Sequence, residues 1–222
     1  MTSGLGRSRM TNPFTYFGAI YCLNLESQPD RWQEVTGRFS TLGILPLVER
    51  FPAISTPENH HRGCALSWRE MVARSAGLGV EHFLGFEDDV IFLDDTLDVV
   101  ARAVRELDQI PWDLCYFGAC VHDREFPFLT ESAVLQECGS VTCTHALAIH
   151  RRAFAQILSD IPGDQSSFGR WLEDYAAIDQ YLAQRIADRT FRAVISSPRV
   201  ATQPALRTFA DADLALADRY VI

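Results

Sequence analysis

The stretch FLGFEDDVIF, residues 83–92, places three consecutive carboxylates between two groups of apolar residues. Phe83 to Phe86 are typical of a buried strand, and Glu87, Asp88 and Asp89 follow at its carboxyl end. Carboxylates this close repel one another, and burying one is costly unless it is paired or bound to a metal. The stretch therefore indicates a strand that ends in an acidic site. The alternative is that the acids begin a solvated loop, with Asp88 capping nearby backbone groups.

Apolar runs and amphipathic segments alternate on both sides of this stretch. The predicted strands are 19–25, 48–54, 81–86, 113–119, 143–149 and 191–195, and the predicted helices are 29–42, 65–76, 96–110, 151–158 and 171–187. This alternation predicts an α/β fold, a three-layer sandwich in which helices cover both faces of a mostly parallel central sheet. We expect a flexible leader over 1–13, a single domain over 14–222 and a mobile loop over 163–169.

Composition and net charge argue against several classes of protein. Of 222 residues, 47% are hydrophobic and 22% are charged, which supplies a core and excludes a disordered chain. The net charge of -9 argues against nucleic acid as the main partner. We find no apolar run of ~18 residues and no apolar signal segment at the start, so we expect a cytoplasmic protein without a transmembrane segment. Peripheral contact with a membrane stays open.

The six cysteines are not expected to form a disulfide framework, because the start of the chain lacks a secretion signal. Cys115 with Cys120 and Cys138 with Cys143 have a spacing that raises zinc as an alternative. Cys115, however, lies in an apolar run that is typical of a core thiol. The adjacent histidines His60 and His61 are expected in a solvated polar loop.

The position of the acids suggests what they bind. In open α/β sheets, ligands bind just beyond the carboxyl ends of the strands. If the chain stays extended there, Glu87 and Asp89 point to one side and Asp88 to the other. Converging carboxylates suit Mg²⁺ or Mn²⁺. Such an ion could bridge two phosphate oxygens and so let an acidic protein hold a diphosphate.

Several segments, taken in order, resemble glycosyltransferase family 25, the lipopolysaccharide-type sugar transferases to which collagen galactosyltransferases are similar. The segments are IYCLNLESQPDRW, FPAI, GCALSW, FLGFEDDVIF, WDLCYFGA, THALAIHRRAF and AIDQYL, and the resemblance covers roughly 19–203. It implies a GT-A-like fold, a nucleotide-sugar donor (usually a UDP-sugar), Mn²⁺ or Mg²⁺, and inversion at the anomeric carbon. It also implies a glycan or lipid-linked acceptor.

The resemblance assigns roles at the donor side. Asn24 and Arg31 would lie near the nucleotide, although Arg31 could instead be an exposed helical arginine. Glu87 and Asp89 would take the role of the family's Asp-x-Asp motif, with Asp89 as the most direct metal ligand. Asp88 would contact the ribose or a basic side chain.

At the acceptor side, His145 could help to bind the metal or the acceptor, the alternative being a histidine satisfied within its strand. An inverting transferase needs a general base near the acceptor hydroxyl. The resemblance places the family's Asp at Asp179, and Glu173 and Asp174 are the other candidates. The alternative for all three is a solvent-facing helix acid.

Arginine and glutamine residues near the tail could reach the donor phosphates. The candidates are Arg199, Gln203 and Arg207.

One residue departs from the family pattern. Trp68 stands where the family often has His, and it fits the core face of its helix. The change suggests a second hypothesis, a catalytically inactive domain that binds a glycan or a protein partner. A third, a metal-dependent phosphohydrolase or nuclease, is disfavoured by the motif and the acidic charge. Metal-dependent binding of a nucleotide diphosphate would separate the first hypothesis from the second.

Overall fold

The structure is a computed structural model that describes residues 12–121, 129, 132–139 and 141–204. The leader predicted over 1–13 lies almost entirely outside these residues, and so does Arg207. Both the leader and the single-domain assignment therefore stay predictions.

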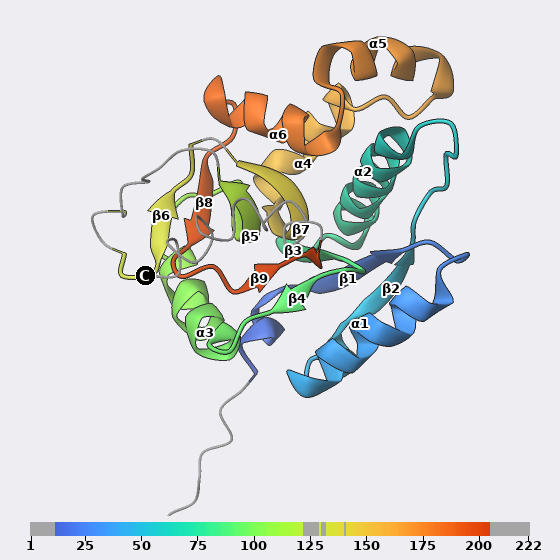
Figure 1. The fold of residues 1–222 in the computed structure, drawn as a ribbon. Helices are drawn as coiled ribbons and strands as arrows, with labels where there is room; N and C mark the ends of the chain where they lie inside the picture. Colours follow the sequence, from blue (N-terminus) through green and yellow to red (C-terminus); the bar gives the residue numbers. More distant parts are fainter. Residues whose placement is uncertain (1–11, 122–128, 130–131, 140, 205–222) are drawn as a thin grey trace, which may run out of the picture.

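A seven-stranded sheet forms the centre of the molecule, in the order β2-β1-β3-β7-β5-β8-β6 (Figure 1). Its strands are β1 (Ala19–Asn24), β2 (Glu49–Pro52), β3 (His82–Glu87), β5 (Leu114–Val121), β6 (Leu135–Glu137), β7 (Val141–His150) and β8 (Ala193–Ser196). β1, β2, β3, β5 and β8 run in one direction, while β7 and β6 run antiparallel to their neighbours. The predicted α/β fold with a mostly parallel central sheet is confirmed.

Helices cover both faces of the sheet (Figure 1). They are α1 (Pro29–Thr41), α2 (His60–Leu78), α3 (Thr96–Leu107), α4 (Arg151–Asp160), α5 (Gln165–Tyr175) and α6 (Ile178–Ala187), with the short 3-10 helices η1 (Pro13–Tyr16) and η2 (Leu45–Leu47). The core on one face joins α2, α4, α5 and α6 to the sheet, and the core on the other joins η1, α1 and α3. The three-layer sandwich follows from this division.

The start of α2 corrects the sequence prediction. The helix begins at His60 rather than near residue 65, because the Asn59 side chain accepts a hydrogen bond from the Arg62 backbone N–H at 3.2 Å and caps the first turn. His60 and His61 therefore belong to a helix and not to a loop. Gly79, in the left-handed conformation with φ 68°, ends the helix.

A second correction concerns the helix predicted over 171–187. Ala176 has φ 61° and Ala177 is extended, so the chain breaks into α5 and α6. A left-handed residue cannot continue a right-handed helix. Since α5 already begins at Gln165, most of the segment predicted as a mobile loop is helical. The break places Asp179 in the first turn of α6.

Three short strands were not predicted: β6 of the central sheet, and two that pair with each other outside it. β4 (Ile91–Phe92) follows the acidic stretch and pairs antiparallel with β9 (Ala201–Thr202) near the end of the described chain. The Thr96 hydroxyl bonds to the carbonyls of Leu93 and Val200 and reinforces this contact. The ladder brings the tail segment back over β5 and β7.

Trp68 packs in the core, as its position on the helix predicted. It is 1% exposed, and a Cβ added to Gly85 of β3 would lie 2.5 Å from its ring. The Trp68 side chain thus occupies space that exists only because residue 85 is glycine. On the same helix, Gly63 approaches the Ile54 carbonyl so closely that an added Cβ would lie 2.3 Å from it.

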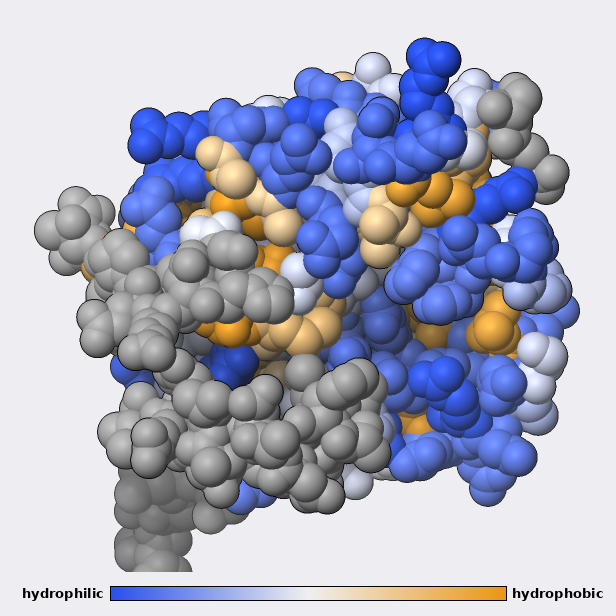
Figure 2. All heavy atoms as spheres, turned by 45° about the horizontal axis from the view of Figure 1, so that its top comes forward, coloured by the Kyte–Doolittle hydropathy of each residue, from blue (hydrophilic) through white to orange (hydrophobic). Residues whose placement is uncertain are grey.

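The surface is mainly hydrophilic on the face seen in Figure 2, with apolar residues in several separate areas between the polar ones. None of the helices in the described part of the chain is both long and apolar enough to cross a membrane.

Candidate active site at the carboxyl ends of β1 and β3

Asp88 joins the ends of β1 and β3 through a polar network. The Asn24 amide donates to its Oδ2 at 2.6 Å, and Arg31 Nη2 lies 2.6 Å from its Oδ1. Arg31 also lies 3.4 Å from Asp89 Oδ2. Arg50 of β2 donates to Asn24 Oδ1 at 3.0 Å and stacks over the Trp32 ring. Two arginines are therefore held at this edge beside the acids.

Glu87, the last residue of β3, lies against β7. Its Oε1 accepts a hydrogen bond from the Thr144 hydroxyl at 2.5 Å. Burial raises the pKa of Glu87 to about 7; the Thr144 bond opposes the rise, while the nearby carboxylates of Asp89, Asp179 and Asp88 add to it. A carboxyl with this pKa is partly protonated at neutral pH, and a bound cation would favour its ionised form.

Asp89 carries an oxygen without a partner. Burial raises its pKa, and the Arg31 guanidinium opposes the rise. Its Oδ1 is buried and finds no hydrogen-bond partner among the residues that the structure describes. An unsatisfied buried carboxylate oxygen is costly, so a ligand atom at this position would be favourable.

Asp179 lies close to Glu87 although the two are far apart in sequence. Its Oδ2 accepts the backbone N–H of Cys143 at 3.0 Å, and its charge acts on Glu87. Cys143 and Thr144 are consecutive in β7, so one short segment contacts both carboxylates. Between Gly118 and Cys120 the partner residues on β7 run from Ala146 to Thr142, so β7 bulges here.

The other predicted site residues lie elsewhere. Glu173 and Asp174 are exposed on α5, which lies at the outer edge of the helical layer (Figure 1). His145 is fully buried; its ring lies against Gly118, and Nε2 is 3.4 Å from the Ala201 carbonyl oxygen. Burial lowers the pKa of His145 to about 4, which keeps the ring neutral. These contacts favour the alternative of a strand histidine, but its Nδ1 is buried and finds no hydrogen-bond partner among the described residues.

The cysteines correct the expectation from sequence. Cys120 of β5 and Cys143 of β7 form a disulfide, with Cα atoms 5.7 Å apart. Cys115 and Cys138 are buried in the core, and neither zinc pairing is formed. The pairing follows from the register, since Cys120 lies opposite Thr142 in the β5–β7 ladder. Two thiols 23 residues apart in sequence gave no local signal of it.

Two of the tail candidates also reach this edge. Arg199 donates to the Ala119 carbonyl at 2.9 Å, and the Gln203 amide lies 3.7 Å from Cys143 Sγ. Sequence reasoning missed Arg50, Thr144 and the two disulfide cysteines as neighbours of the acids. Thr144 stands in the segment THALAIHRRAF, one residue before the candidate His145. Arg50 lies within the strand predicted over 48–54, whose carboxyl end reaches the same edge, and that was a usable signal.

Glu87 and Asp89 fit a divalent cation that takes its other ligands from the substrate and from water. Among the described residues, no group of three or more His, Cys, Asp or Glu side chains is arranged to hold a metal ion by itself. Mg²⁺ in phosphate-handling sites commonly uses one or two carboxylates, with substrate oxygens and water supplying the other ligands. Asp89, with its unpartnered Oδ1, and Glu87 suit a site of that kind.

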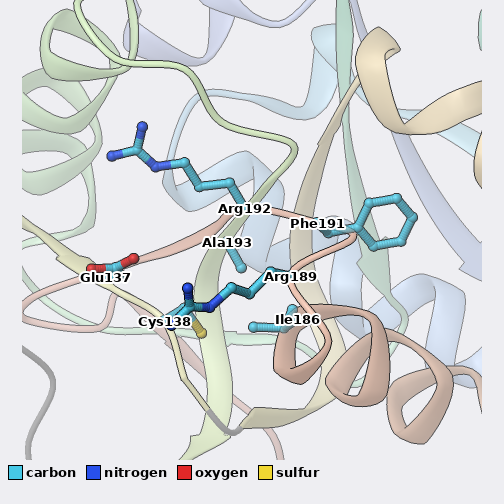
Figure 3. A pocket seen from close by; sticks show the side chains of 7 residues that line it. All are labelled: Glu137, Cys138, Ile186, Arg189, Phe191, Arg192 and Ala193. Atoms are coloured by element: carbon cyan, nitrogen blue, oxygen red, sulfur yellow. The ribbon is translucent and has the colours of Figure 1, made fainter.

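A separate hollow of about 360 Å³ lies at the amino end of β8 (Figure 3). It is lined by Glu137, Cys138, Ile186, Arg189, Phe191, Arg192 and Ala193. In Figure 3 the Arg189 side chain extends toward Cys138. None of the predicted site residues lines it, and β8 begins at the edge of the sheet opposite to the acids.

Comparison with known proteins shows a resemblance of the chain to a glycosyltransferase family. No protein-family model matches the chain. A curated protein of Drosophila pseudoobscura pseudoobscura named "Glycosyltransferase 25 family member" is 26% identical over 195 residues, which covers 73% of this chain. The resemblance to glycosyltransferase family 25 is confirmed. This chain spans 29% of the length of that family 25 relative.

Solved structures give a weaker likeness. They include a glycosyltransferase involved in the glycosylation of the major capsid of PBCV-1 (TM-score 0.43, 10% identity, 80% of this chain and 79% of that chain). A197 from STIV has a TM-score of 0.46 at 9% identity, over 83% of this chain and 93% of that chain. Mannose-1-phosphate geranyltransferase from Thermus thermophilus has a TM-score of 0.42 at 10% identity, over 80% of this chain and 72% of that chain. TM-scores this low support no functional argument.

Proposed function

We propose that this chain is a glycosyltransferase that moves a sugar from a nucleotide-sugar, a UDP-sugar in the first instance, to a hydroxyl of a glycan or lipid-linked acceptor. The convergence of Glu87, Asp89 and Asp179 at the carboxyl ends of β1 and β3 carries the proposal. The family 25 relative supports it.

The donor side is built from β1, β3 and α1. Arg31 and Arg50 offer positive charge to the donor diphosphate, and Asn24 holds Asp88 in place between them. Asp89 and Glu87 would hold Mn²⁺ or Mg²⁺. When bound, such an ion neutralises the charge that develops on the departing nucleotide diphosphate.

The acceptor side is built from α6 and β7. Asp179 is the proposed general base that takes the proton from the acceptor hydroxyl, and the Cys143 N–H fixes one of its oxygens at 3.0 Å. A base on one side of the anomeric carbon and a leaving diphosphate on the other give in-line attack with inversion. Glu173 and Asp174 stay alternatives, but their exposed positions on α5 make them weaker ones.

Donor turnover tests this proposal. A panel of UDP-sugars is incubated with Mn²⁺, with and without glycan acceptors, and release of UDP is followed for wild type, Asp179→Asn and Glu173→Gln. We expect Asp179→Asn to lose about 10²–10⁴-fold in kcat while it still binds UDP. Glu173→Gln, the matched control on α5, should turn over like wild type. Full activity of Asp179→Asn would remove Asp179 from the mechanism.

The second candidate is a catalytically inactive domain that binds a glycan or a protein partner. It is favoured by the ion pairs of Arg31 with Asp88 and Asp89, because a side chain of the chain itself supplies these two acids with a counter-charge. The absence of nucleotide binding in the presence of Mn²⁺ and Mg²⁺ would support this candidate over the transferase.

A further inference from the structure

The segment that connects the two sides of the site has an unusual backbone. Cys143 has φ 66°, a left-handed conformation that residues with a side chain rarely adopt outside turns. It lies at the β7 bulge, and bulges beside functional sites commonly re-aim side chains and backbone groups. Here the bulge aims the Cys143 N–H at Asp179 and the next side chain, Thr144, at Glu87.

Something must hold this conformation, because a strained residue persists only where its surroundings over-determine it. The strongest restraint on Cys143 is covalent. Its Sγ is bonded to Cys120 of the neighbouring strand β5, and the Gln203 amide lies 3.7 Å from the same sulfur. Both cysteines are only partly buried.

We propose that Cys143 is a positioning residue for the Asp179–Glu87 pair, and that its disulfide to Cys120 makes this site responsive to thiols. The catalytic consequence rests on the proposed transferase function, whereas the positioning itself does not.

The switching step is a two-electron exchange. The thiolate of a dithiol reductant attacks one sulfur of the Cys120–Cys143 bond, the S–S bond breaks, and a mixed disulfide forms. The second thiol of the reductant then releases the protein, leaving two cysteine thiols and the oxidised, disulfide form of the reductant. After reduction, Cys143 can relax to negative φ, which turns its N–H away from Asp179.

Three substitutions separate positioning from bulk stabilisation. Cys120→Ser and Cys143→Ser both remove the disulfide. Both leave residue 143 with a side chain, which disfavours positive φ there. Cys143→Gly also removes the bond, but glycine adopts φ near 66° at little cost. If the disulfide acts only as a staple, glycine should be at least as harmful as serine. If Cys143 positions the acids, Cys143→Gly should rescue the site.

The first readout does not depend on function. In denatured, unreduced protein, mass spectrometry after alkylation should show Cys120 linked to Cys143 and the other four cysteines not disulfide-bonded. Hydrogen exchange of the residue-143 amide, followed by NMR, should then quicken about tenfold or more on reduction or in Cys143→Ser. In Cys143→Gly the exchange of this amide should stay slow and should not change when the dithiol is added. Six free thiols, or unchanged protection after reduction, would overturn the proposal.

The second readout is UDP release from the UDP-sugar panel. We expect kcat to fall about 10–100-fold on reduction, with KM for the donor nearly unchanged, and Cys143→Gly to keep the oxidised rate. If amide protection falls but kcat does not, Cys143 does not position the catalytic acids. If protection falls and no nucleotide binds in any state, the transferase proposal fails while the structural coupling stands.

Discussion

Glu87 shows how burial and charge compete at a single residue. Its carboxyl is held by Thr144 and surrounded by other acids, and its pKa is raised from 4.5 to about 7, with burial as the main cause. The folded chain therefore binds a proton here that the unfolded chain releases at lower pH. The partly buried position of this carboxyl therefore lowers the unfolding free energy at neutral pH.

The raised pKa of Glu87 should make the unfolding free energy of the metal-free protein depend on pH. A raised carboxyl pKa contributes stability below 4.5, and this contribution is lost as the pH rises to about 7. Glu87→Gln keeps an acceptor for Thr144 but cannot ionise. From pH 4.5 to 7.5, wild type should lose up to about 3 kcal/mol of unfolding free energy relative to Glu87→Gln in urea titrations. A difference that does not change with pH would contradict the shift.

Gly85 and Trp68 make a second prediction at the residue scale. A Cβ at residue 85 would lie 2.5 Å from the Trp68 ring, so Gly85→Ala should cost about 1–3 kcal/mol in unfolding free energy. Gly37 in α1 has nothing within 4 Å of an added Cβ. Gly37→Ala should therefore stabilise by about 0.5–1 kcal/mol through helix propensity. Equal effects of the two substitutions in thermal unfolding would contradict the packing of Trp68 on β3.

At the scale of elements, the break between α5 and α6 decides where Asp179 lies. It was not predictable from sequence, since Ala176 and Ala177 are strong helix formers and the apolar stripe continues across them. Tertiary packing overrides that propensity. The six longer strands were predicted because buried apolar runs are local signals, whereas the β7 bulge and the Cys120–Cys143 bond depend on the register of strands distant in sequence.

The break can be tested by exchanging alanine for glycine at two positions. Ala176 is exposed and has φ 61°, so Ala176→Gly should relieve strain and raise the unfolding free energy by about 1 kcal/mol. Ala183 lies inside α6 in the ordinary helical conformation, and Ala183→Gly should lower it by a similar amount. Destabilisation by both substitutions would indicate that α5 and α6 form one continuous helix.

At the scale of the whole molecule, the sheet order brings residues from four separate segments to one edge. Asn24 ends β1, Glu87 ends β3 and the other two acids follow it. Cys143 and Thr144 lie near the start of β7, and Asp179 lies in the first turn of α6. The acidic stretch and its place after a strand could be found from the sequence alone. The partners that tune it could not, because Arg50, Thr144 and the disulfide reach the edge only through strand pairing.

The central claim is that this edge binds a nucleotide diphosphate through a divalent cation. Calorimetric titration of UDP with Mn²⁺, with Mg²⁺ and with chelator tests it most directly, using Asp89→Asn and, as the matched control, Asp94→Asn at an exposed position. We predict binding that needs the metal, persists in Asp94→Asn and is lost in Asp89→Asn. UDP binding that is equal in chelator, or unchanged in Asp89→Asn, would contradict the account.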